Sequence, residues 1–560
     1  MNNNGKKKKT RNEKKLHQHS QESGAYLFLK SLEEHDVDRI FSVSGSDYAA
    51  IIEEKVRGVG PELVIVPHEI PAVGAAIGYS LGGKVGVVGV HTLPGTANAV
   101  GAVMNAYGSK IPLVLIAGRT PYTEEGNAAS RNRMIHWTQE TRDQGGIVRQ
   151  WTKWDYEVRR AEQVPQAVSR AFQLATSEPC GPVYLMLPRE VTVEKAGTAA
   201  SRVRLGTYEP GPSPEALEEA SKMINASRHP VIITWRAGRK RKWFDSLRAF
   251  ADAKNVPVVN YAGEALNYPS SGKMALDRYD LKRTADLILV VECEVPWIPS
   301  RVGELPATTK VIKVDTDPGH QYIPFYSFPS DLSVASSVNH FFDALMDRVE
   351  PKDEEPISKL REEQQREKGR EIRQWKRSKT RIHPRLLSHE IGKLGLTIVN
   401  EYPFDPNYCV LDRYGTYYAN LSVGYLGWAM GAAVGLKMAT GTDAVATVGD
   451  GAFMFGVPEA FYYLAHSCPV MVAIFDNGGW MSSSESAVDV YPTGLAAKKH
   501  KFPGTEFEQY ELGATVKAFD GHFQMVERAD QIAPALERGR EELQKRKRIS
   551  VLQFVVERTR

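Results

Sequence analysis

Short runs of apolar residues recur along most of the chain and alternate with longer segments whose apolar positions repeat with helical spacing. Uninterrupted apolar runs are typical of strands in parallel sheets, and the amphipathic segments between them are typical of crossover helices. The run at 444–448, the helical pattern at 458–466 and the run at 470–475 form one such unit. The pattern predicts an α/β fold of doubly wound, mostly parallel sheets.

The expected strands fall into three groups separated by polar segments. They are 40–43, 63–67, 85–90, 113–116 and 183–187 in the first group, 231–234, 256–260, 287–291 and 310–314 in the second, and 397–399, 444–448, 471–475 and 551–556 in the third. A segment with Pro and Gly follows the first group, and a segment of charged residues and Gln with no apolar face, 353–379, precedes the third. We therefore expect a first domain at 23–195, a central domain at 214–349, a charged linker at 350–380 and a third domain at 381–560.

The third group contains the most specific chemical pattern of the chain. Gly449, Asp450, Gly451 and Ala452 follow one expected strand, and Asn477 and Gly479 follow the next. Asp, Asn and backbone carbonyl oxygens are hard ligands that suit Mg²⁺, and glycines let the backbone approach a diphosphate closely. Gly-Asp-Gly alone is also ordinary turn chemistry. Bracketed by two strands and followed by Asn477, it resembles the diphosphate–metal motif of thiamine-diphosphate enzymes, with Asp450, Asn477 and Gly479 as metal ligands.

A second part of that resemblance lies upstream, where Glu69 follows the expected strand at 63–67 and precedes a helix expected at 70–81. Its position resembles that of the catalytic Glu whose carboxyl group contacts the aminopyrimidine ring of the cofactor. A carboxyl group at that nitrogen favours the imino tautomer, which removes the proton that activates the cofactor. The alternative is an acid placed at a helix N-terminus for the helix dipole. With the downstream motif present, we favour the catalytic role.

The order of the three domains resembles the pyruvate-oxidase-like branch of these enzymes, namely a pyrimidine domain, a central domain and a diphosphate domain. The resemblance implies a homodimer or homotetramer in which each cofactor lies between the first domain of one chain and the third domain of another. It further implies that Leu426 wedges under the cofactor and that the carbonyl of Gly424 accepts a hydrogen bond from it. Asn400 and Glu401, at a strand end, match positions that help to hold the diphosphate. The alternative for 423–433 is a buried helix of small residues, and both can hold together.

The first domain also carries candidates for contact with the substrate. Ser46 and His91 lie in segments that resemble benzoylformate decarboxylase, which implies a hydroxyl for the substrate carboxylate and a histidine for proton transfer. The alternative for His91 is a structural histidine at a strand end. That enzyme brings a second histidine from its central domain, and 291–297 has none. His136 and Gln139 lie in a segment that resembles the Gln-containing loop of acetolactate synthases, and either side chain is a candidate for the active site.

The central domain differs from the flavin-binding members of the family. Its first strand leads into a segment with a single glycine, Gly238, and a run of cations at 239–242. This is a poor flavin loop, so we expect no FAD. The cations suit an anionic group such as a nucleotide phosphate or, as the favoured alternative, a solvated surface loop. Asp476 replaces an Asn that is usual in the family, but it is not the expected metal ligand.

Composition places the chain among globular enzymes, because apolar residues make up 42% and charged residues 25%. No apolar run is long enough for a transmembrane helix, so we expect no membrane partner. The first twenty residues carry a net charge of +6 against +4 for the whole chain, so the basicity belongs to a tail at 1–22 that we expect to be disordered. We expect no specific nucleic-acid partner. Four scattered cysteines without metal-binding spacing predict a reducing, cytoplasmic compartment.

Together these patterns predict an enzyme that uses thiamine diphosphate and Mg²⁺ to cleave or form a C–C bond next to a carbonyl. We favour decarboxylation of a 2-oxo acid with carboligation, as in acetolactate synthases, because the Gln139 segment is present and the central histidine is absent. The alternatives are a benzoylformate-type decarboxylase and a lyase of 2-hydroxyacyl-CoA or diketone substrates. A non-catalytic, cofactor-binding protein is the alternative from another class.

Overall fold

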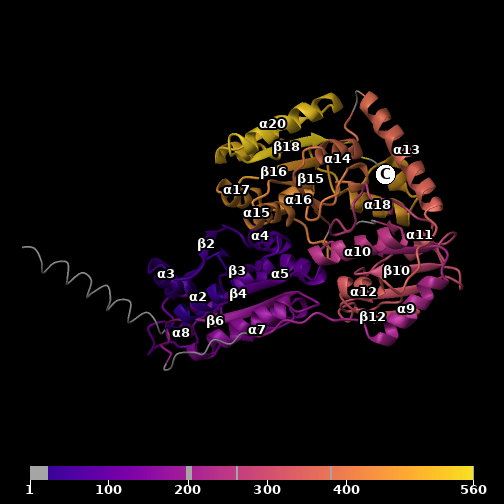
Figure 1. Cartoon of the computed structure of the whole chain (residues 1–560). Helices are drawn as coiled ribbons and strands as arrows, with labels where there is room; N and C mark the ends of the chain where they lie inside the picture. The colour runs from indigo at the N-terminus through magenta and orange to yellow at the C-terminus, as the bar shows by residue number, and fades with distance from the viewer. Residues whose placement is uncertain (1–22, 197–204, 260–262, 379–380, 420, 559–560) are drawn as a thin grey trace, which may run out of the picture. The chain divides into compact units, whose positions relative to one another are not determined.

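The computed structural model describes residues 23–196, 205–259, 263–378, 381–419 and 421–558. Its strands form three six-stranded sheets in which all strand pairs are parallel. The chain divides into two compact units, Met1–Ser80 with Lys84–Tyr208, and Leu81–Gly83 with Glu209–Arg560. The first unit holds one sheet and the second holds the other two (Figure 1). The predicted fold class is thereby confirmed, whereas the expected basic tail at 1–22 lies outside the described residues.

The first sheet has the strand order β2-β1-β3-β4-β6-β5. Its strands are β1 (Arg39–Ser42), β2 (Glu62–Ile65), β3 (Gly86–Val90), β4 (Leu113–Arg119), β5 (Asp155–Glu157) and β6 (Pro182–Pro188). The order reverses between β1 and β3, and doubly wound sheets bind ligands beyond the carboxyl ends of the strands at such a reversal. Strand β5 was not predicted, because it is a short edge strand of half-buried, mostly polar residues.

Helices of the first unit connect these strands. They are α2 (Gly24–Glu34), α3 (Ala49–Val56), α4 (Glu69–Leu81), α5 (Thr92–Gly108), α6 (Ile135–Thr138), α7 (Val164–Thr176) and α8 (Arg189–Val193). Helix α2 begins where the Ser23 hydroxyl accepts a hydrogen bond from the amide of Tyr26, which is a standard N-cap. Its apolar face, with Phe28 and Leu32, packs with Phe172 of α7 in the core of this unit.

The central sheet has the strand order β12-β11-β10-β7-β8-β9. Its strands are β7 (Pro230–Thr234), β8 (Val258–Val259), β9 (Ala275–Leu276), β10 (Leu287–Val291), β11 (Lys310–Asp315) and β12 (Leu332–Ala335), and its helices are α9 (Pro214–Ala226), α10 (Arg241–Lys254), α11 (Pro299–Val302) and α12 (Val338–Leu345). Strands β9 and β12 were not predicted, since both are short outer strands. Strand β8 is shorter than expected, and the predicted end of this strand at Asn260 lies outside the described residues.

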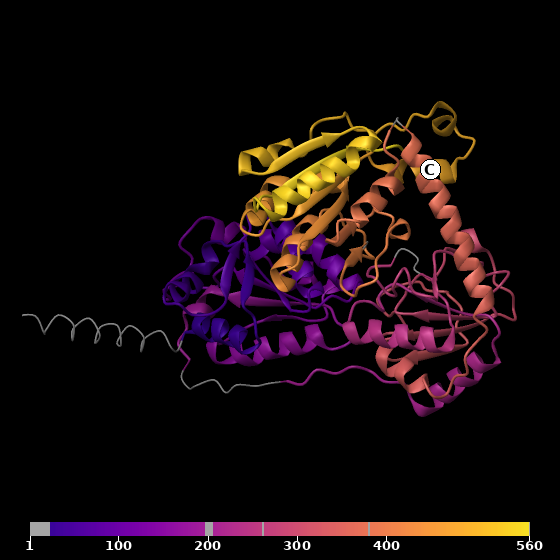
Figure 2. The ribbon, with the colours of Figure 1, turned by 45° about the horizontal axis from the view of Figure 1, so that its top comes forward.

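The segment at 353–379, expected as a charged linker without an apolar face, folds as the long helix α13 (Glu355–Arg377) (Figure 2). Ile357 is buried in the central core, and Ile372 and Trp375 pack against the core of the third sheet. The expectation of a segment without an apolar face was therefore wrong. The apolar stripe is too narrow to stand out among charged neighbours, although its spacing is helical.

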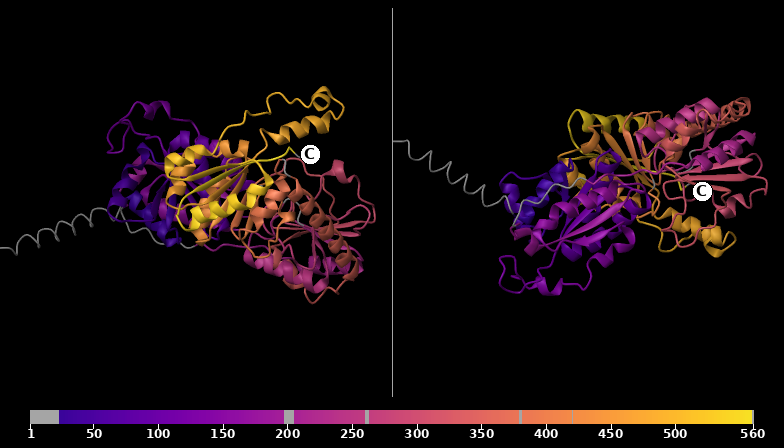
Figure 3. Two further views of the ribbon diagram at one scale, coloured as in Figure 1. Left: turned by 90° about the horizontal axis from the view of Figure 1, so that it is seen from above. Right: turned by 60° about the horizontal axis from the view of Figure 1, so that its bottom comes forward.

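The third sheet has the strand order β14-β13-β15-β16-β18-β17. Its strands are β13 (Thr397–Glu401), β14 (Tyr417–Ala419), β15 (Ala444–Gly449), β16 (Met471–Asp476), β17 (His522–Val526) and β18 (Ser550–Val555), and its helices are α14 (Pro384–Gly392), α15 (Ala429–Thr440), α16 (Asp450–Phe455), α17 (Pro458–His466), α18 (Met481–Val490), α19 (Leu495–Lys499) and α20 (Ile532–Gln544). Helix α15 packs on β15 and α20 packs on β18. Helices α18 and α19 extend away from the sheet (Figure 3, left, dark yellow). Strands β14 and β17, both outer strands, were not predicted.

Membrane-spanning candidates were sought among the helices of the described residues. None of these helices combines the length and the hydrophobicity that a membrane crossing requires.

Candidate functional site

The carboxyl ends of β13, β15 and β16 open onto a cavity of about 760 Å³. The sequence-predicted residues that line it are Glu401, Gly424, Leu426, Gly449, Asp450, Gly451, Ala452, Asn477 and Gly479. The strand order reverses between β13 and β15, so the cavity lies where open α/β sheets bind ligands. The structure therefore brings together, at one edge of the third sheet, residues that are far apart in the sequence.

Asp450 occupies the first position of α16, directly after β15. Its two carboxylate oxygens accept hydrogen bonds from the backbone amides of Gly451 (2.8 Å) and Gly479 (2.7 Å). Burial raises the pKa of Asp450 to about 6, the amides oppose that rise, and the charge of nearby Asp476 adds to it. The site thus holds a carboxylate whose negative charge is poorly compensated by the protein alone, and a bound cation would stabilise it.

Asn477 faces the same cavity, and its side-chain oxygen Oδ1 is buried without a hydrogen-bond partner among the described residues. An amide oxygen and a carboxylate with free lone pairs form a donor set that fits Mg²⁺ or Ca²⁺. Both side chains of the predicted metal site therefore lie where a cation would satisfy them.

The loop that carries Asn477 depends on glycine. Gly479 has a φ of +146°, and a Cβ there would lie 2.0 Å from the backbone oxygen of Thr505. Arg558, which sequence reasoning missed, donates hydrogen bonds to the backbone oxygens of Asn477 (2.7 Å) and Gly478 (2.5 Å). This arginine lies beyond β18 and far from the motif in sequence, so no local pattern indicated its role.

Glu401 and Asn400 both make hydrogen bonds within the protein. Glu401 lines the cavity, but its carboxylate accepts hydrogen bonds from the amides of Gly427 (2.5 Å) and Ala429 (3.0 Å) at the start of α15. Burial raises its pKa to about 7, and these amides oppose the rise. The side chain of Asn400 bonds to Phe404, to Thr447 and to other groups inside the sheet, so it supports the fold rather than the cavity.

The segment before α15 has the conformation that a close backbone approach requires. Gly424 has a φ of +77°, and a Cβ there would lie 2.7 Å from the hydroxyl of Tyr402, which also lines the cavity. Tyr402 itself has a φ of +79°, a strained conformation for a bulky residue. Strain of this kind is concentrated at functional sites. Leu426, the candidate wedge residue, lines the same cavity.

In the first unit, Glu69 begins α4 just beyond the carboxyl end of β2 and is buried. Its carboxylate accepts a hydrogen bond from the amide side chain of Asn98 (3.1 Å). A Cβ at Gly95 would lie 3.1 Å from the other carboxylate oxygen, so α5 leaves room for this acid. The helix-dipole placement and a catalytic role are both compatible with this position.

The predicted substrate-contacting residues gather at the carboxyl ends of β1 and β3. His91 follows β3, and its Nδ1 lies 2.5 Å from a carboxylate oxygen of Asp47. The hydrogen bond that the Asp47 carboxylate accepts from His91, and to a smaller extent a hydrogen bond with Gln139, raise the pKa of His91 against the effect of burial. Ser46 Oγ lies 3.3 Å from Nε2 of His136.

The surroundings of His136 favour its neutral form. Burial lowers its pKa, and the positive charges of Arg189 and Arg133 lower it further. The backbone amide of Asn132 donates to Nδ1 of His136 (3.2 Å), so the proton of the neutral ring is on Nε2 and points at Ser46. The site therefore contains two histidines whose surroundings move their pKa values in opposite directions, a pattern associated with separate acid and base roles.

The corresponding edge of the central sheet is filled by a buried ion network. Arg236, which follows β7, is 1% exposed and pairs with Glu294, Glu264 (3.5 Å) and Glu292 (3.8 Å). In the predicted basic run, Lys240 pairs with Glu209 (2.6 Å) and Arg241 pairs with Asp245 (2.9 Å). These local partners favour the interpretation of the run as a surface loop.

Comparison with known protein families gives matches to the two parts of the chain that contain the candidate residues. Residues 22–147 match the description "Thiamine pyrophosphate enzyme, N-terminal TPP binding domain", and residues 406–554 match "Thiamine pyrophosphate enzyme, C-terminal TPP binding domain". The chain belongs to the thiamine pyrophosphate enzyme family. Glu69 and His91 lie in the first of these two domains, and Asp450 and Asn477 lie in the second.

Related thiamine pyrophosphate enzymes span most of the chain. A Zea mays protein named acetolactate synthase 1, chloroplastic, is 24% identical over 81% of this chain and 73% of its own length. A Pseudomonas aeruginosa protein named probable 2-ketoarginine decarboxylase is 25% identical over 85% of this chain and 86% of its own. The crystal structure of benzoylformate decarboxylase from Polynucleobacter necessarius superposes with a TM-score of 0.78 at 21% identity, covering 96% of this chain and 99% of that one. The two sequence relatives place the chain in the acetolactate synthase and decarboxylase group of the family, and the solved structure shows that the fold is shared.

Proposed function

We propose that this thiamine pyrophosphate enzyme decarboxylates a 2-oxo acid and joins the resulting fragment to a second carbonyl compound, as an acetolactate synthase does, with Mg²⁺ as its metal. The proposal rests on the observation that the carboxylate of Asp450 and the unpartnered Oδ1 of Asn477 belong to residues that line one cavity. The relatives named as acetolactate synthases support the choice of reaction.

Residues of the third sheet are proposed to hold the cofactor. The oxygens of Asp450 and Asn477, with the backbone near Gly479, would hold Mg²⁺, and the glycines around Asp450 leave the backbone open to a diphosphate. Leu426 and Gly424 would shape the remainder of the cavity. Thiamine diphosphate, when bound, would supply a nucleophilic thiazolium carbon and a ring that takes up the electron pair of the broken C–C bond.

Residues of the first sheet are proposed to handle protons and the substrate. Glu69 would hold a proton at the cofactor ring, with its carboxylate oriented by Asn98. The Ser46 hydroxyl oxygen would accept a hydrogen bond from the protonated Nε2 of His136. The hydroxyl hydrogen of Ser46 could then be donated to a substrate oxygen. His91 would transfer a proton through Nε2, since Nδ1 is engaged by Asp47.

A homodimer or homotetramer with active sites shared between chains is part of the proposal, and the family resemblance supports it. We also propose that the central domain binds no FAD. A Cβ at Gly238 would lie 1.9 Å from the backbone oxygen of Leu266, so this glycine serves packing within the protein rather than the approach of a ligand phosphate. The four cysteines are present as thiols rather than as disulfides, which supports the proposal of a reducing, cytoplasmic compartment.

A benzoylformate-type decarboxylase is the second candidate, favoured by the presence of His91 and Ser46 at the same strand ends. The experiment that separates the two is product analysis after addition of thiamine diphosphate, Mg²⁺ and a panel of 2-oxo acids. Acetolactate from pyruvate is the expected result, whereas an aldehyde from an aromatic oxo acid would favour the decarboxylase. Loss of products in Glu69→Gln but not in Glu62→Gln, an exposed acid on β2, would assign the activity to this site.

Turnover of none of the oxo acids, with cofactor demonstrably bound, would contradict both candidates. The next substrates would then be 2-hydroxyacyl-CoA and diketone compounds, which belong to the lyase alternative.

A further inference from the structure

A carboxylate that the sequence analysis did not single out lies directly behind His91. Asp47 is 5% exposed, belongs to the turn η1 (Ser46–Tyr48) after β1, and contacts Nδ1 of His91 through Oδ1. Its other oxygen, Oδ2, is buried without a hydrogen-bond partner among the described residues. The carboxylate therefore has a single hydrogen-bonding contact with a titratable group, and that group is His91.

The backbone around this pair is built to bring the two side chains together. A Cβ at Gly45 would lie 2.1 Å from Nδ1 of His91, and a Cβ at Gly118 would lie 1.8 Å from Oδ2 of Asp47. Only glycine at these positions allows the ring and the carboxylate to approach so closely. The absence of a side chain at Gly45, after β1, and at Gly118, near the end of β4, thus makes room for His91 and Asp47.

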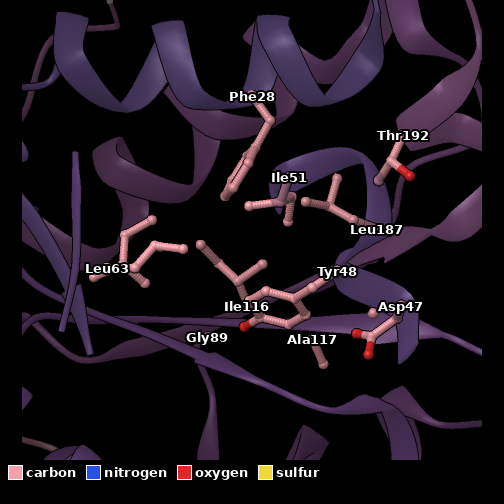
Figure 4. A pocket seen from close by; sticks show the side chains of 12 residues that line it. Phe28, Asp47, Tyr48, Ile51, Leu63, Gly89, Ile116, Ala117, Leu187 and Thr192 are labelled. Atoms are coloured by element: carbon pink, nitrogen blue, oxygen red, sulfur yellow. The ribbon is translucent and has the colours of Figure 1, made fainter. Parts of the chain in front are cut away.

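The surroundings of Asp47 make the contact strong. Figure 4 shows Asp47 and Tyr48 beside a small cavity of about 20 Å³, which is otherwise lined largely by apolar side chains such as Phe28, Ile51 and Ile116. An ionic hydrogen bond gains strength where the local dielectric constant is low. The pair therefore lies beside a largely apolar wall of the cavity.

The turn that carries His91 is strained. Thr92, the next residue, has a φ of +36°, which a β-branched residue rarely adopts. Strain of this type persists only where surrounding contacts fix it, and it is concentrated at functional sites. The strain supports a specific orientation of the His91 ring rather than a histidine that merely fills space.

We propose that Asp47 is a positioning residue of the active site, which fixes Nδ1 of His91 as a donor and leaves Nε2 as the atom that exchanges a proton with the substrate. In this step the imidazolium gives the Nε2 proton to a substrate atom. The electron pair of the broken N–H bond stays on Nε2, Nδ1–H stays bonded to Asp47, and solvent returns the proton. This assignment rests on the proposed function of His91.

Other charged groups around His91 act in a consistent way. Glu69 contributes a negative charge that favours the protonated ring, Gln139 contributes a neutral hydrogen bond, and His136 is the nearby group whose own pKa is lowered in part by the charge of His91. Asp47 makes the largest contribution to the raised pKa of His91. Its removal is therefore expected to lower the pKa of His91 more than removal of any other single neighbour.

The test is Asp47→Asn in the full-length protein, with Asp38→Asn as the matched control. Asp38 also accepts hydrogen bonds within the first unit, but from Tyr79 and Lys84. The pKa of His91 is measured by NMR on ¹³C-labelled histidine without cofactor, with the signal assigned by its loss in His91→Asn. We expect a lower pKa of His91 in Asp47→Asn and no change in Asp38→Asn. An unchanged pKa in folded Asp47→Asn would overturn the proposal.

Kinetics supply a second readout that a purely structural role would not move. With a substrate that the wild-type enzyme converts, Asp47→Asn should lower kcat by about tenfold or more with little change in KM. The same substitution should move the pH profile of kcat to lower pH. In a His91→Ala background the same substitution should have no further effect. Equal losses in both backgrounds would overturn the proposal. If no substrate is found, the proposed function fails, while the NMR measurement still decides whether Asp47 controls His91.

Discussion

The carboxylate of Asp450 accepts two backbone hydrogen bonds, yet its pKa is raised to about 6. For an acid whose pKa is higher in the folded state than in the unfolded state, the folded protein binds the extra proton between the two values. The stability contributed by this group is therefore lost as the pH rises from about 4 to about 6. A cation restores it, because a cation favours the charged carboxylate.

The raised pKa of Asp450 predicts that Mg²⁺ binding weakens as the pH falls. One pH unit below a pKa of about 6, only about a tenth of Asp450 is charged, so Mg²⁺ affinity at pH 5 should be about tenfold weaker than at pH 7.5. Calorimetric titration with Mg²⁺ in the presence of thiamine diphosphate measures the difference. Asp450→Asn should bind Mg²⁺ weakly at both pH values. A wild-type affinity that does not change between pH 5 and pH 7.5 would contradict the assignment of Asp450 as a ligand.

Candidate site residues were predictable from the sequence where they lie within a local motif next to an expected strand. Asp450, Asn477 and Glu69 follow expected strands directly, so their types and places were predictable. Asp47 and Arg558 were missed, because each acts on a group that only the folded chain brings near it. Asn400 illustrates the opposite case. It lies at a strand end and matches a family motif, but its side chain makes hydrogen bonds within the third domain, to Phe404 and Thr447.

At the scale of elements, Glu401 lines the cavity and joins the end of β13 to the start of α15 through hydrogen bonds. Its carboxylate satisfies amides that the first turn of a helix leaves without intrahelical partners. Glu401→Ala would leave these buried amides unsatisfied at a cost of about 1–3 kcal/mol. Because Gly424 and Leu426 precede this turn, the substitution should also weaken thiamine diphosphate binding.

The matched control for this prediction is Glu459→Ala. Glu459 is an exposed acid in the first turn of α17 and should contribute only about 0.3–1 kcal/mol through the helix dipole. Thermal unfolding without ligand and cofactor titration by tryptophan fluorescence measure the two effects. Equal behaviour of the two variants would show that Glu401 does not organise the start of α15.

Strands with an uninterrupted apolar run, including the outer strand β2, were predictable from the sequence, whereas the other five outer strands were not. Strands β5, β9, β12, β14 and β17 are short outer strands, several of them only half-buried, and their residues lack the run that identifies a central strand. Helix α13 was missed as a packed element for a related reason. Its buried positions form a narrow stripe that charged residues outnumber.

At the scale of the whole molecule, the two groups of candidate residues lie in different TPP binding domains. If an active site takes Glu69 from one chain and Asp450 from another, two inactive variants can restore each other. In a dimer formed from equal amounts of Glu69→Gln and Asp450→Asn chains, half of the dimers are mixed, and each mixed dimer has one intact site out of two. Co-expression should therefore recover up to about a quarter of the wild-type activity.

The control pair is Asn477→Ala with Asp450→Asn. Both changes lie in the same domain, so every shared site contains one of them, and no activity should return. Activity is measured on complexes purified through two different affinity tags, so only mixed assemblies are assayed, and in these the expected recovery of the Glu69 and Asp450 pair rises to about half of the wild-type activity. Recovery in the Glu69 and Asp450 pair alone would establish sites shared between chains, because a site built within one chain keeps one defect in each chain. Absence of recovery in a purified mixed dimer would instead show that each chain supplies both halves of its own site.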